Sequence, residues 1–234
     1  MVIIYGISEA TKEFLKRMPK DVKSLDDIDK IHQKLTQEYD DLENKGLVAK
    51  FNRWSKKRQI KKIEENQGSA EHKGARGEVL ALEKLSELSD DFHVFCGVNK
   101  ELKNYVTYRR KRNLKSAQMD FVVVSRRGVA VIEVKNWSSF YYKNHYGIAP
   151  HEQVDRAGRV LWISIQSSWF SPKKPPVNSV LLSIQGNIGY DNNYGYVSVK
   201  NLNNINYFLQ KKEEQFSEKE VGRLIGRIKG DITK

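Results

Sequence analysis

The first third of the chain has the apolar spacing of a helical hairpin. After Ser24, apolar residues recur at steps of three and four positions, which is typical of one face of an amphipathic helix. Ser24 is the expected N-cap, and Gly46 suits a left-handed C-cap. A second helix is predicted from Leu47 to Ile63. Residues 1–73 are therefore expected to form a helical, coiled-coil-like region. The apolar positions of the first helix are Leu25, Ile28, Ile31, Leu35, Tyr39 and Leu42.

From Gly74 onward the pattern becomes mixed. Short β-branched and aromatic runs are bracketed by stretches of helical periodicity, which predicts an α/β (α+β) domain over residues 74–234. Gln67-Gly68-Ser69-Ala70 is the expected linker. Ser217 and Glu220 have the spacing of a capping box at the last helix. Helices are predicted at 78–88 and 154–165, and strands at 93–98, 177–184 and 196–199.

Two apolar runs on either side of a basic turn predict a β-hairpin. Gly128 suits the left-handed position of a short loop, and a four-residue connection built on a type I turn pairs Val124 with Val129. Counting outward from that pair places Asp120 opposite Glu133. A three-residue loop with a bulge would shift the register by one residue and send Asp120 to the other face of the sheet.

In the first of these registers, three polar side chains converge on one face. Asp120 and Glu133 are directly opposed, and Lys135, two residues further on, returns to the same face. Two close carboxylates repel each other unless a cation neutralises them, and hard oxygen ligands favour Mg²⁺ or Mn²⁺. A lysine beside such a metal can orient water or stabilise charge on a phosphate. The alternative is that Glu133 and Lys135 form a surface pair at a strand end.

These residues carry a resemblance to a known family. The order Gly74-x-x-Gly77-Glu78, then Gln118 to Ser125, then Gly128 and Val131 to Trp137, resembles the nuclease-related domain (NERD), a branch of the PD-(D/E)XK restriction-endonuclease-like superfamily. Pro150-x-x-Gln153 resembles a downstream element of that family. The resemblance implies a central mixed sheet flanked by helices. It also implies metal-dependent hydrolysis of DNA phosphodiester bonds, with the chain expected to act as an endonuclease.

The resemblance also implies residue roles. Asp120, Glu133 and the Val134 carbonyl would bind Mg²⁺ or Mn²⁺, and Lys135 would assist the attacking water. Two further catalytic residues would be Glu78, holding a metal-bound water or a second ion, and Gln153, supporting the site or touching nucleic acid. Alternatively, Glu78 is only an acid favoured at a helix N-terminus, and Gln153 an exposed amide. Met119 stands where the superfamily name has proline.

Charge adds a nucleic-acid partner to this picture. The formal net charge is +12 and the sequence pI is about 9.5, which favours nucleic acid or an anionic membrane surface. The second helix is also densely basic, from Lys50 to Lys62, which fits either a solvated face or a contact with nucleic acid or a partner. Solvated surface charge is likewise the alternative for the other basic clusters. The nucleic-acid-binding candidates are Arg109, Arg110, Lys111, Arg112, Arg126, Arg127 and Arg156.

Composition limits which classes of protein are compatible with the sequence. No apolar run approaches the roughly 20 residues of a spanning helix, so membrane insertion is not expected. A single cysteine, Cys96, excludes an internal disulfide and favours a reducing, cytoplasmic setting. The alternatives to a DNA nuclease are a nuclease directed at RNA, or a non-catalytic nucleic-acid-binding module. The N-terminal helices are a further candidate surface, for a homo-oligomer or a partner protein.

Overall fold

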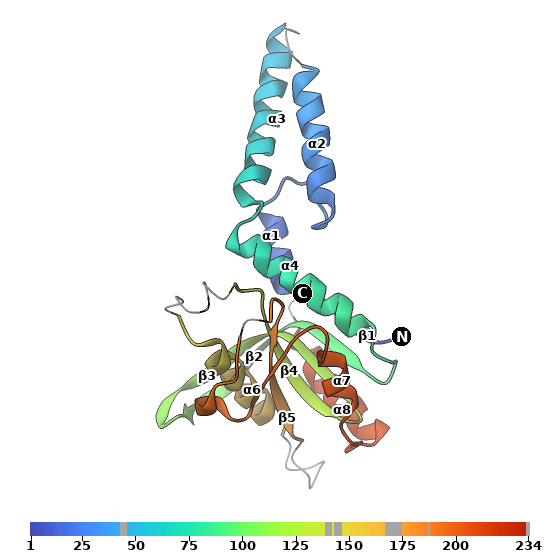
Figure 1. The fold of residues 1–234 in the computed structure, drawn as a ribbon, viewed down its shortest axis with the longest axis vertical. Coiled ribbons are helices and arrows are strands. Elements are labelled where there is room, and N and C mark those ends of the chain that lie inside the picture. Colours follow the sequence, from blue (N-terminus) through green and yellow to red (C-terminus); the bar gives the residue numbers. More distant parts are fainter. Residues whose placement is uncertain (43–45, 139–141, 143–146, 167–174, 187, 233–234) are drawn as a thin grey trace. The chain divides into compact units, whose positions relative to one another are not determined.

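The computed structural model describes all residues except 43–45, 139–141, 143–146, 167–174, 187 and 233–234 (Figure 1). The chain divides into two compact units. One unit comprises residues 10–76, and the other combines residues 1–9 with residues 77–234. Within the described residues, no helix is both long enough and apolar enough to span a membrane.

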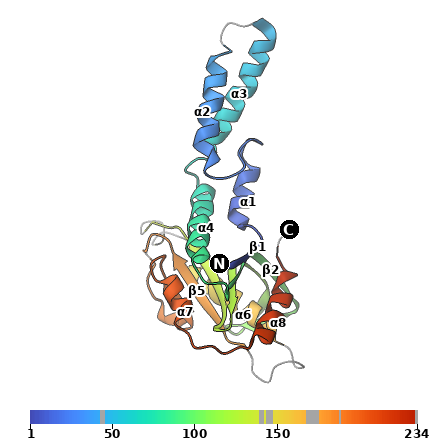
Figure 2. The ribbon, with the colours of Figure 1, turned by 90° about the vertical axis from the view of Figure 1, so that its right-hand side faces the viewer.

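The smaller unit is helical. Helix α2 packs against α3, and the two run side by side (Figures 1 and 2). Ile28 and Leu35 of α2 and Ala49 and Ile63 of α3 are buried, so the apolar spacing of the sequence provides the packing between the helices. The helices are α1 (Glu9–Lys16), α2 (Asp27–Asp40), α3 (Gly46–Asn66) and α4 (Ala70–Ser86), which continues into the larger unit.

The ends of these helices differ from the sequence prediction. Ser24 does not cap α2; its backbone N–H donates to Asp27 Oδ2 at 2.8 Å, and the helix begins at Asp27. Gly46 opens α3 instead of closing the helix before it. The expected linker is reduced to a turn at Gly68, where φ is +81°, because α4 already begins at Ala70.

The larger unit is built on a six-stranded mixed sheet with the order β1-β2-β3-β4-β5-β6. Strands β2, β3 and β4 pair antiparallel, whereas β1 on β2, β4 on β5 and β5 on β6 pair parallel. The strands are β1 (Ile3–Tyr5), β2 (His93–Tyr108), β3 (Lys111–Ser125), β4 (Gly128–Lys135), β5 (Val177–Ser183) and β6 (Val197–Lys200).

Strand β1 changes the expected division of the chain. Residues 1–9 were assigned by sequence to the helical region, but Ile3, Ile4 and Tyr5 pair with His93 to Phe95 of β2. These first nine residues therefore belong to the unit of the sheet. A three-residue strand at a sheet edge carries too short an alternation to be recognised in the sequence.

Helices cover both faces of the sheet, which confirms the predicted mixed α/β class. On one face, α6 and α8 pack against Val122, Val131 and Leu181. On the other face, α4 and α7 pack against Phe121 and Ile132. The capping box at the start of α8 is present, since Ser217 and Glu220 each accept from the backbone N–H of the other. The bounds are α6 (Pro150–Ile165), α7 (Ile205–Gln210) and α8 (Glu218–Lys229).

The hairpin of β3 and β4 has the register predicted from its turn. Val124 pairs with Val129, and the ladder continues to Phe121 and Ile132. The next residue, Asp120, accepts a hydrogen bond from the backbone N–H of Val134 at 2.8 Å. The alternative register, with Asp120 on the opposite face, is therefore excluded.

Candidate active site

Two adjacent antiparallel strands bring the first carboxylates together. Val122 of β3 and Val131 of β4 lie on the face of the sheet that α6 covers. Side chains two residues apart on a strand share a face, so Asp120 and Glu133 lie on that face as well. The two carboxylates are close enough that the charge of Asp120 raises the pKa of Glu133. The sheet thus holds both acids on one face, at the end of β4 that carries Lys135.

Glu133 is the most constrained side chain of the site. It is only 2% exposed, and its Oε1 lies 2.7 Å from Nζ of Lys135. Burial, reinforced by the charge of Asp120, raises the pKa of Glu133 to about 8, against the opposing effect of Lys135. Its second oxygen, Oε2, is buried and has no hydrogen-bond partner within the described part of the chain. A buried carboxylate oxygen without a partner is costly, and a ligand would satisfy it.

The pKa of Asp120 is raised as well. Burial raises the pKa of its carboxyl group, while Lys135 and the N–H of Val134 oppose the rise. The hydrogen bond from Val134 fixes Oδ2 and orients the other carboxyl oxygen. With both pKa values raised, a neighbouring divalent cation would favour the ionised form of the two acids.

Helix α4 contributes a third acid. Glu78 is buried, and its charge raises the pKa of Glu133 further, so it lies within electrostatic reach of Glu133. The helix can approach β4 closely because residue 77 is glycine: a Cβ there would lie 2.8 Å from Cβ of Asn136. Glu78 also contributes to raising the pKa of the buried thiol of Cys96 to about 12, which burial mainly causes.

Ser8 is a site residue that the sequence prediction missed. Its hydroxyl donates to Oε2 of Glu78 at 2.6 Å, and both residues are buried. Ser8 follows β1, so the short edge strand places it beside α4. No sequence signal could have found this contact, because the two residues are 70 positions apart and β1 was not predicted.

Ser183 is a second residue that was missed. It is the register partner of Lys135 across the parallel pair of β4 and β5, and it is 1% exposed. Its Oγ is buried without a hydrogen-bond partner among the described residues. Two unsatisfied buried oxygens, on Glu133 and Ser183, therefore lie on neighbouring strands around Lys135.

Comparison with family models establishes what kind of domain this is. Residues 73–183 match the model of the nuclease-related domain, or NERD. This chain carries a nuclease-related domain. The matched range contains Glu78, Asp120, Glu133 and Lys135, and it ends at Ser183. Neither the comparison with curated proteins nor that with solved structures found a match.

The donor set of the NERD domain fits a hard divalent ion. Two carboxylates, of Asp120 and Glu133, and the Val134 carbonyl offer only oxygen ligands, and one carboxylate oxygen lacks a partner among the described residues. The described residues contain no group of three His, Cys, Asp or Glu side chains arranged to hold a metal ion. Magnesium commonly binds through one or two carboxylates and completes its shell with water and substrate phosphates. A two-carboxylate site is therefore chemically sufficient.

Gln153 and the neighbouring histidine have separate environments in the NERD domain. Gln153 is exposed near the start of α6. His151 is buried, and a ring nitrogen lies 2.8 Å from the carbonyl oxygen of Gly189, which ties α6 to the loop before β6. The packing around His151 is thus structural, while Gln153 remains available to solvent.

Part of the predicted basic surface gathers on the ribbon formed by the ends of β2 and β3. Arg109 and Arg110 form its turn with φ of +45° and +69°, a conformation that usually selects glycine or asparagine. Arg109 lies over the ring of Tyr194 at 4.1 Å, and Arg156 of α6 donates to the Asn113 carbonyl at 3.2 Å. The ribbon extends beyond the end of β4 that carries the acids, because β3 pairs with β4 only from Phe121 onward. Lys111 and Arg112, which follow the turn, are exposed.

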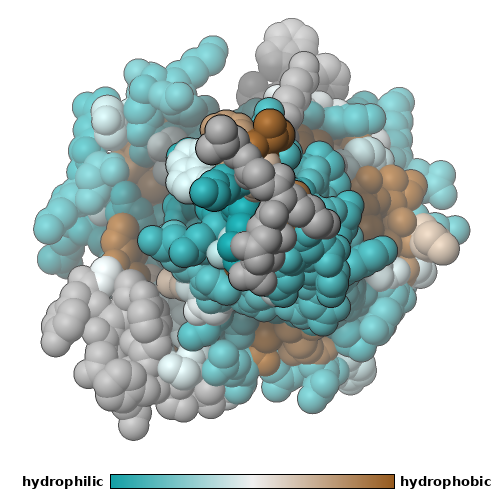
Figure 3. All heavy atoms as spheres, turned by 90° about the horizontal axis from the view of Figure 1, so that it is seen from above, coloured by the Kyte–Doolittle hydropathy of each residue, from teal (hydrophilic) through white to brown (hydrophobic). Residues whose placement is uncertain are grey.

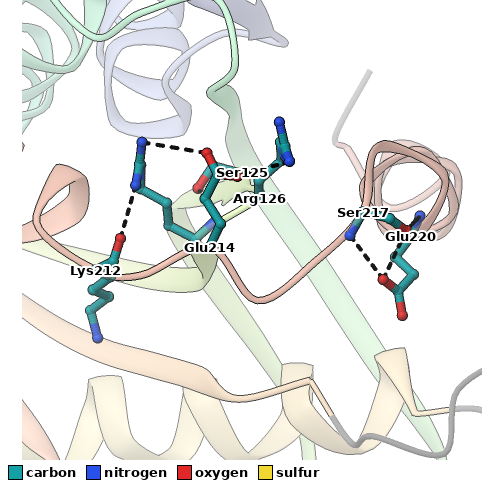
Figure 4. A network of polar contacts seen from close by, with 7 residues as sticks. Ser125, Arg126, Lys212, Glu214, Ser217 and Glu220 are labelled. Atoms are coloured by element: carbon teal, nitrogen blue, oxygen red, sulfur yellow. Dashed lines mark hydrogen bonds and ion pairs between the residues drawn. The ribbon is translucent and has the colours of Figure 1, made fainter.

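Arg126 and Arg127 lie at the opposite end of β3 and β4. Arg126 forms an ion pair with Glu214 at 2.8 Å (Figure 4). Arg127 donates to the Lys212 carbonyl at 3.0 Å. The backbone carbonyl of Arg126 also accepts from the N–H groups of residues 215 and 216. With a rise of about 3.3 Å per residue, this turn is roughly 15–20 Å from the acids. These two arginines anchor the segment before α8.

Proposed function

We propose that this chain is a metal-dependent nuclease that hydrolyses phosphodiester bonds of DNA. The observation that carries the proposal is the convergence of Asp120, Glu133 and Lys135 on one face, with Oε2 of Glu133 buried and unpartnered among the described residues. The match to the nuclease-related domain supports the reaction class. The alternative, a surface pair of Glu133 and Lys135 at a strand end, does not account for a glutamate that is only 2% exposed.

Each side chain has a distinct part in the proposed reaction. Asp120, Glu133 and the Val134 carbonyl would hold Mg²⁺ or Mn²⁺, and Glu78 would accept a hydrogen bond from a bound water. The metal, when bound, supplies Lewis acidity and lowers the pKa of coordinated water. Lys135 places a positive charge beside the carboxylates, where it orients the attacking water and stabilises negative charge on the phosphate. The exposed Gln153 would contact the nucleic acid.

The proposed DNA-binding surface is the basic ribbon beyond the acids. Arg110 and Arg112 are exposed there, and Arg156 joins the ribbon through Asn113. Positive charge next to an acidic site allows a phosphate backbone to approach it. Such contacts position DNA without reading its sequence.

The test is cleavage of several substrates by matched variants. Wild type, Glu133→Ala and Lys135→Ala are incubated with circular and linear DNA, single- and double-stranded, and with RNA, in Mg²⁺, Mn²⁺ or chelator. We expect nicking of circular DNA only with metal, and a loss of at least about 100-fold in each variant. Glu83→Gln, at an exposed position of α4, is the control. Equal cleavage by wild type and both variants would overturn the proposal, and cleavage of RNA alone would redirect it to RNA.

A second candidate function is nucleic-acid binding without catalysis. It is favoured by the direct ion pair between Glu133 and Lys135, which partly neutralises the acidic site without a metal. This candidate predicts salt-sensitive binding to DNA with no metal-dependent cleavage of any substrate above.

A further inference from the structure

Helix α3 has an outer face with an unusual composition. With about 100° between successive residues, eight exposed side chains fall within an arc of roughly 140°, and seven of them are cationic or aromatic. Five are cations and two are aromatic, Phe51 at 68% and Trp54 at 57% exposed. Glu65 lies on the same arc at the end of the helix. The seven are Lys50, Phe51, Trp54, Lys57, Arg58, Lys61 and Lys62, hereafter the α3 outer face.

This face is turned away from the partner helix. Ala49 and Ile63 of α3 are buried, Lys56 forms an ion pair with Glu38 of α2, and Arg53 lies over the ring of Tyr39. Those four α3 residues occupy the opposite side of the helix wheel from the outer face. The packing of the hairpin therefore does not use Phe51 and Trp54, and their exposure needs another explanation.

The charges of the outer face are little compensated. Within the described residues, Lys50 and Lys57 form no ion pair, and Lys61 lies 3.5 Å from Glu65 in a pair that is largely exposed. The guanidinium of Arg58 lies over the Trp54 ring at 5.8 Å, and the Phe51 and Trp54 rings are 6.0 Å apart. The cations and aromatic rings thus form one continuous surface, about 18 Å long from Lys50 to Lys62. Figure 3, which views the molecule from above, shows mostly hydrophilic side chains with a few hydrophobic ones among them.

We propose that the α3 outer face binds single-stranded nucleic acid, with its cations along the phosphate backbone and Phe51 and Trp54 stacking on unpaired bases. Interleaved cations and exposed aromatic rings are the means by which proteins hold single strands without sequence preference. A second copy of this chain fits poorly, because two such faces would oppose five cations with five. An inserted membrane helix needs a wider apolar face than two rings provide. This binding proposal depends on the proposed nuclease function only in its choice of nucleic acid as the ligand.

Binding can be measured separately from cleavage. The full-length chain is titrated into a fluorescein-labelled oligothymidylate in chelator, and anisotropy is followed at several salt concentrations. We expect Lys57→Gln/Lys61→Gln to reduce the slope of log affinity against log salt by about 1.4, since each single-strand phosphate contact contributes about 0.7. Trp54→Ala should weaken binding about 5- to 150-fold with little change in that slope, and Trp54→Phe should restore most of it.

The matched control has the same charge change outside α3. Lys20→Gln/Lys23→Gln alters two exposed lysines of the same helical unit and should bind like wild type. Equal effects of the two double variants would overturn the proposal. So would binding of anionic phospholipid vesicles but not the oligonucleotide, or a doubled mass by light scattering that Trp54→Ala abolishes.

The two proposals fail in different ways. Glu133→Ala is assayed for cleavage, whereas the α3 variants are assayed for binding in chelator. If Glu133→Ala abolishes cleavage while the α3 variants bind normally, the nuclease stands and the α3 proposal is wrong. If the α3 variants lose binding while no protein cleaves any substrate, the α3 face stands and the nuclease proposal is wrong.

Discussion

The ammonium group of Lys135 lies 2.7 Å from Oε1 of Glu133, two residues earlier on the same strand. Even with this contact, burial and the charge of Asp120 raise the pKa of Glu133 to about 8. The acid is therefore held in a place where its charge is costly. Such a carboxylate is suited to a ligand that brings positive charge.

This relationship predicts a pH dependence of stability in metal-free protein. Because the folded pKa of Glu133 is above its unfolded value, the folded state binds the proton more tightly. Its contribution to stability is complete at low pH and is lost as the pH rises from about 4.5 to 8, by at most about 1.4 kcal/mol per pH unit. Glu133→Gln should flatten this fall in urea unfolding with chelator. Glu83→Gln should retain the wild-type slope, and identical slopes for all three proteins would contradict the assignment.

Ser8 is predicted to position Glu78 for catalysis. Ser8→Ala removes the donor 2.6 Å from Glu78 Oε2 and should lower cleavage about 10- to 100-fold. Ser8→Thr, which keeps the hydroxyl group, should restore most activity. The metal concentration for half-maximal cleavage is the second measurement, because a purely structural role would leave it unchanged. Ser164→Ala on α6 is the control, and loss of activity there as well would remove the specific role of Ser8.

Gly77 and Gly74 on α4 offer a matched test of close packing. A Cβ at position 77 would lie 2.8 Å from Asn136 Cβ, whereas nothing lies within 4 Å of a Cβ at position 74. Gly77→Ala should destabilise the fold by about 1–3 kcal/mol. Gly74→Ala should stabilise it by about 0.4–1 kcal/mol, because alanine favours the helix. Thermal unfolding measures both, and equal effects would show that α4 does not approach Asn136 as described.

The turn with Arg126 and Arg127 is expected to contribute to stability, and the turn with Arg109 and Arg110 to DNA binding. Arg127→Gln removes the contact with the Lys212 carbonyl and should cost about 0.5–1.5 kcal/mol of unfolding free energy, with little effect on duplex DNA binding in chelator. Arg110→Gln, on the exposed ribbon, should leave stability nearly unchanged and reduce the salt dependence of DNA binding by about 0.9. If instead Arg127→Gln reduced the salt dependence of DNA binding and Arg110→Gln reduced stability, DNA would approach the other end of the sheet.

The sequence alone determined the local frame of the site. Gly128 and the alternation of apolar residues in β3 and β4 gave the register in which Val124 pairs with Val129, and that register brought Asp120, Glu133 and Lys135 to one face. The helical spacing of apolar residues in α2, α3 and α6 can be recognised in the sequence for the same reason. Neighbouring strands and single helices depend on residues close together along the chain, and those distances can be read from spacing.

Only the tertiary structure decided which distant residues complete the site. Ser8 reaches Glu78 through a three-residue edge strand, and Ser183 becomes the partner of Lys135 through a parallel pairing. Arg126 and Arg127 resembled DNA contacts in the sequence, but they hold Glu214 and the Lys212 carbonyl. These relationships depend on how the chain returns to the sheet after long connections. Local periodicity carries no information about that return, because it is fixed by the packing of the whole domain.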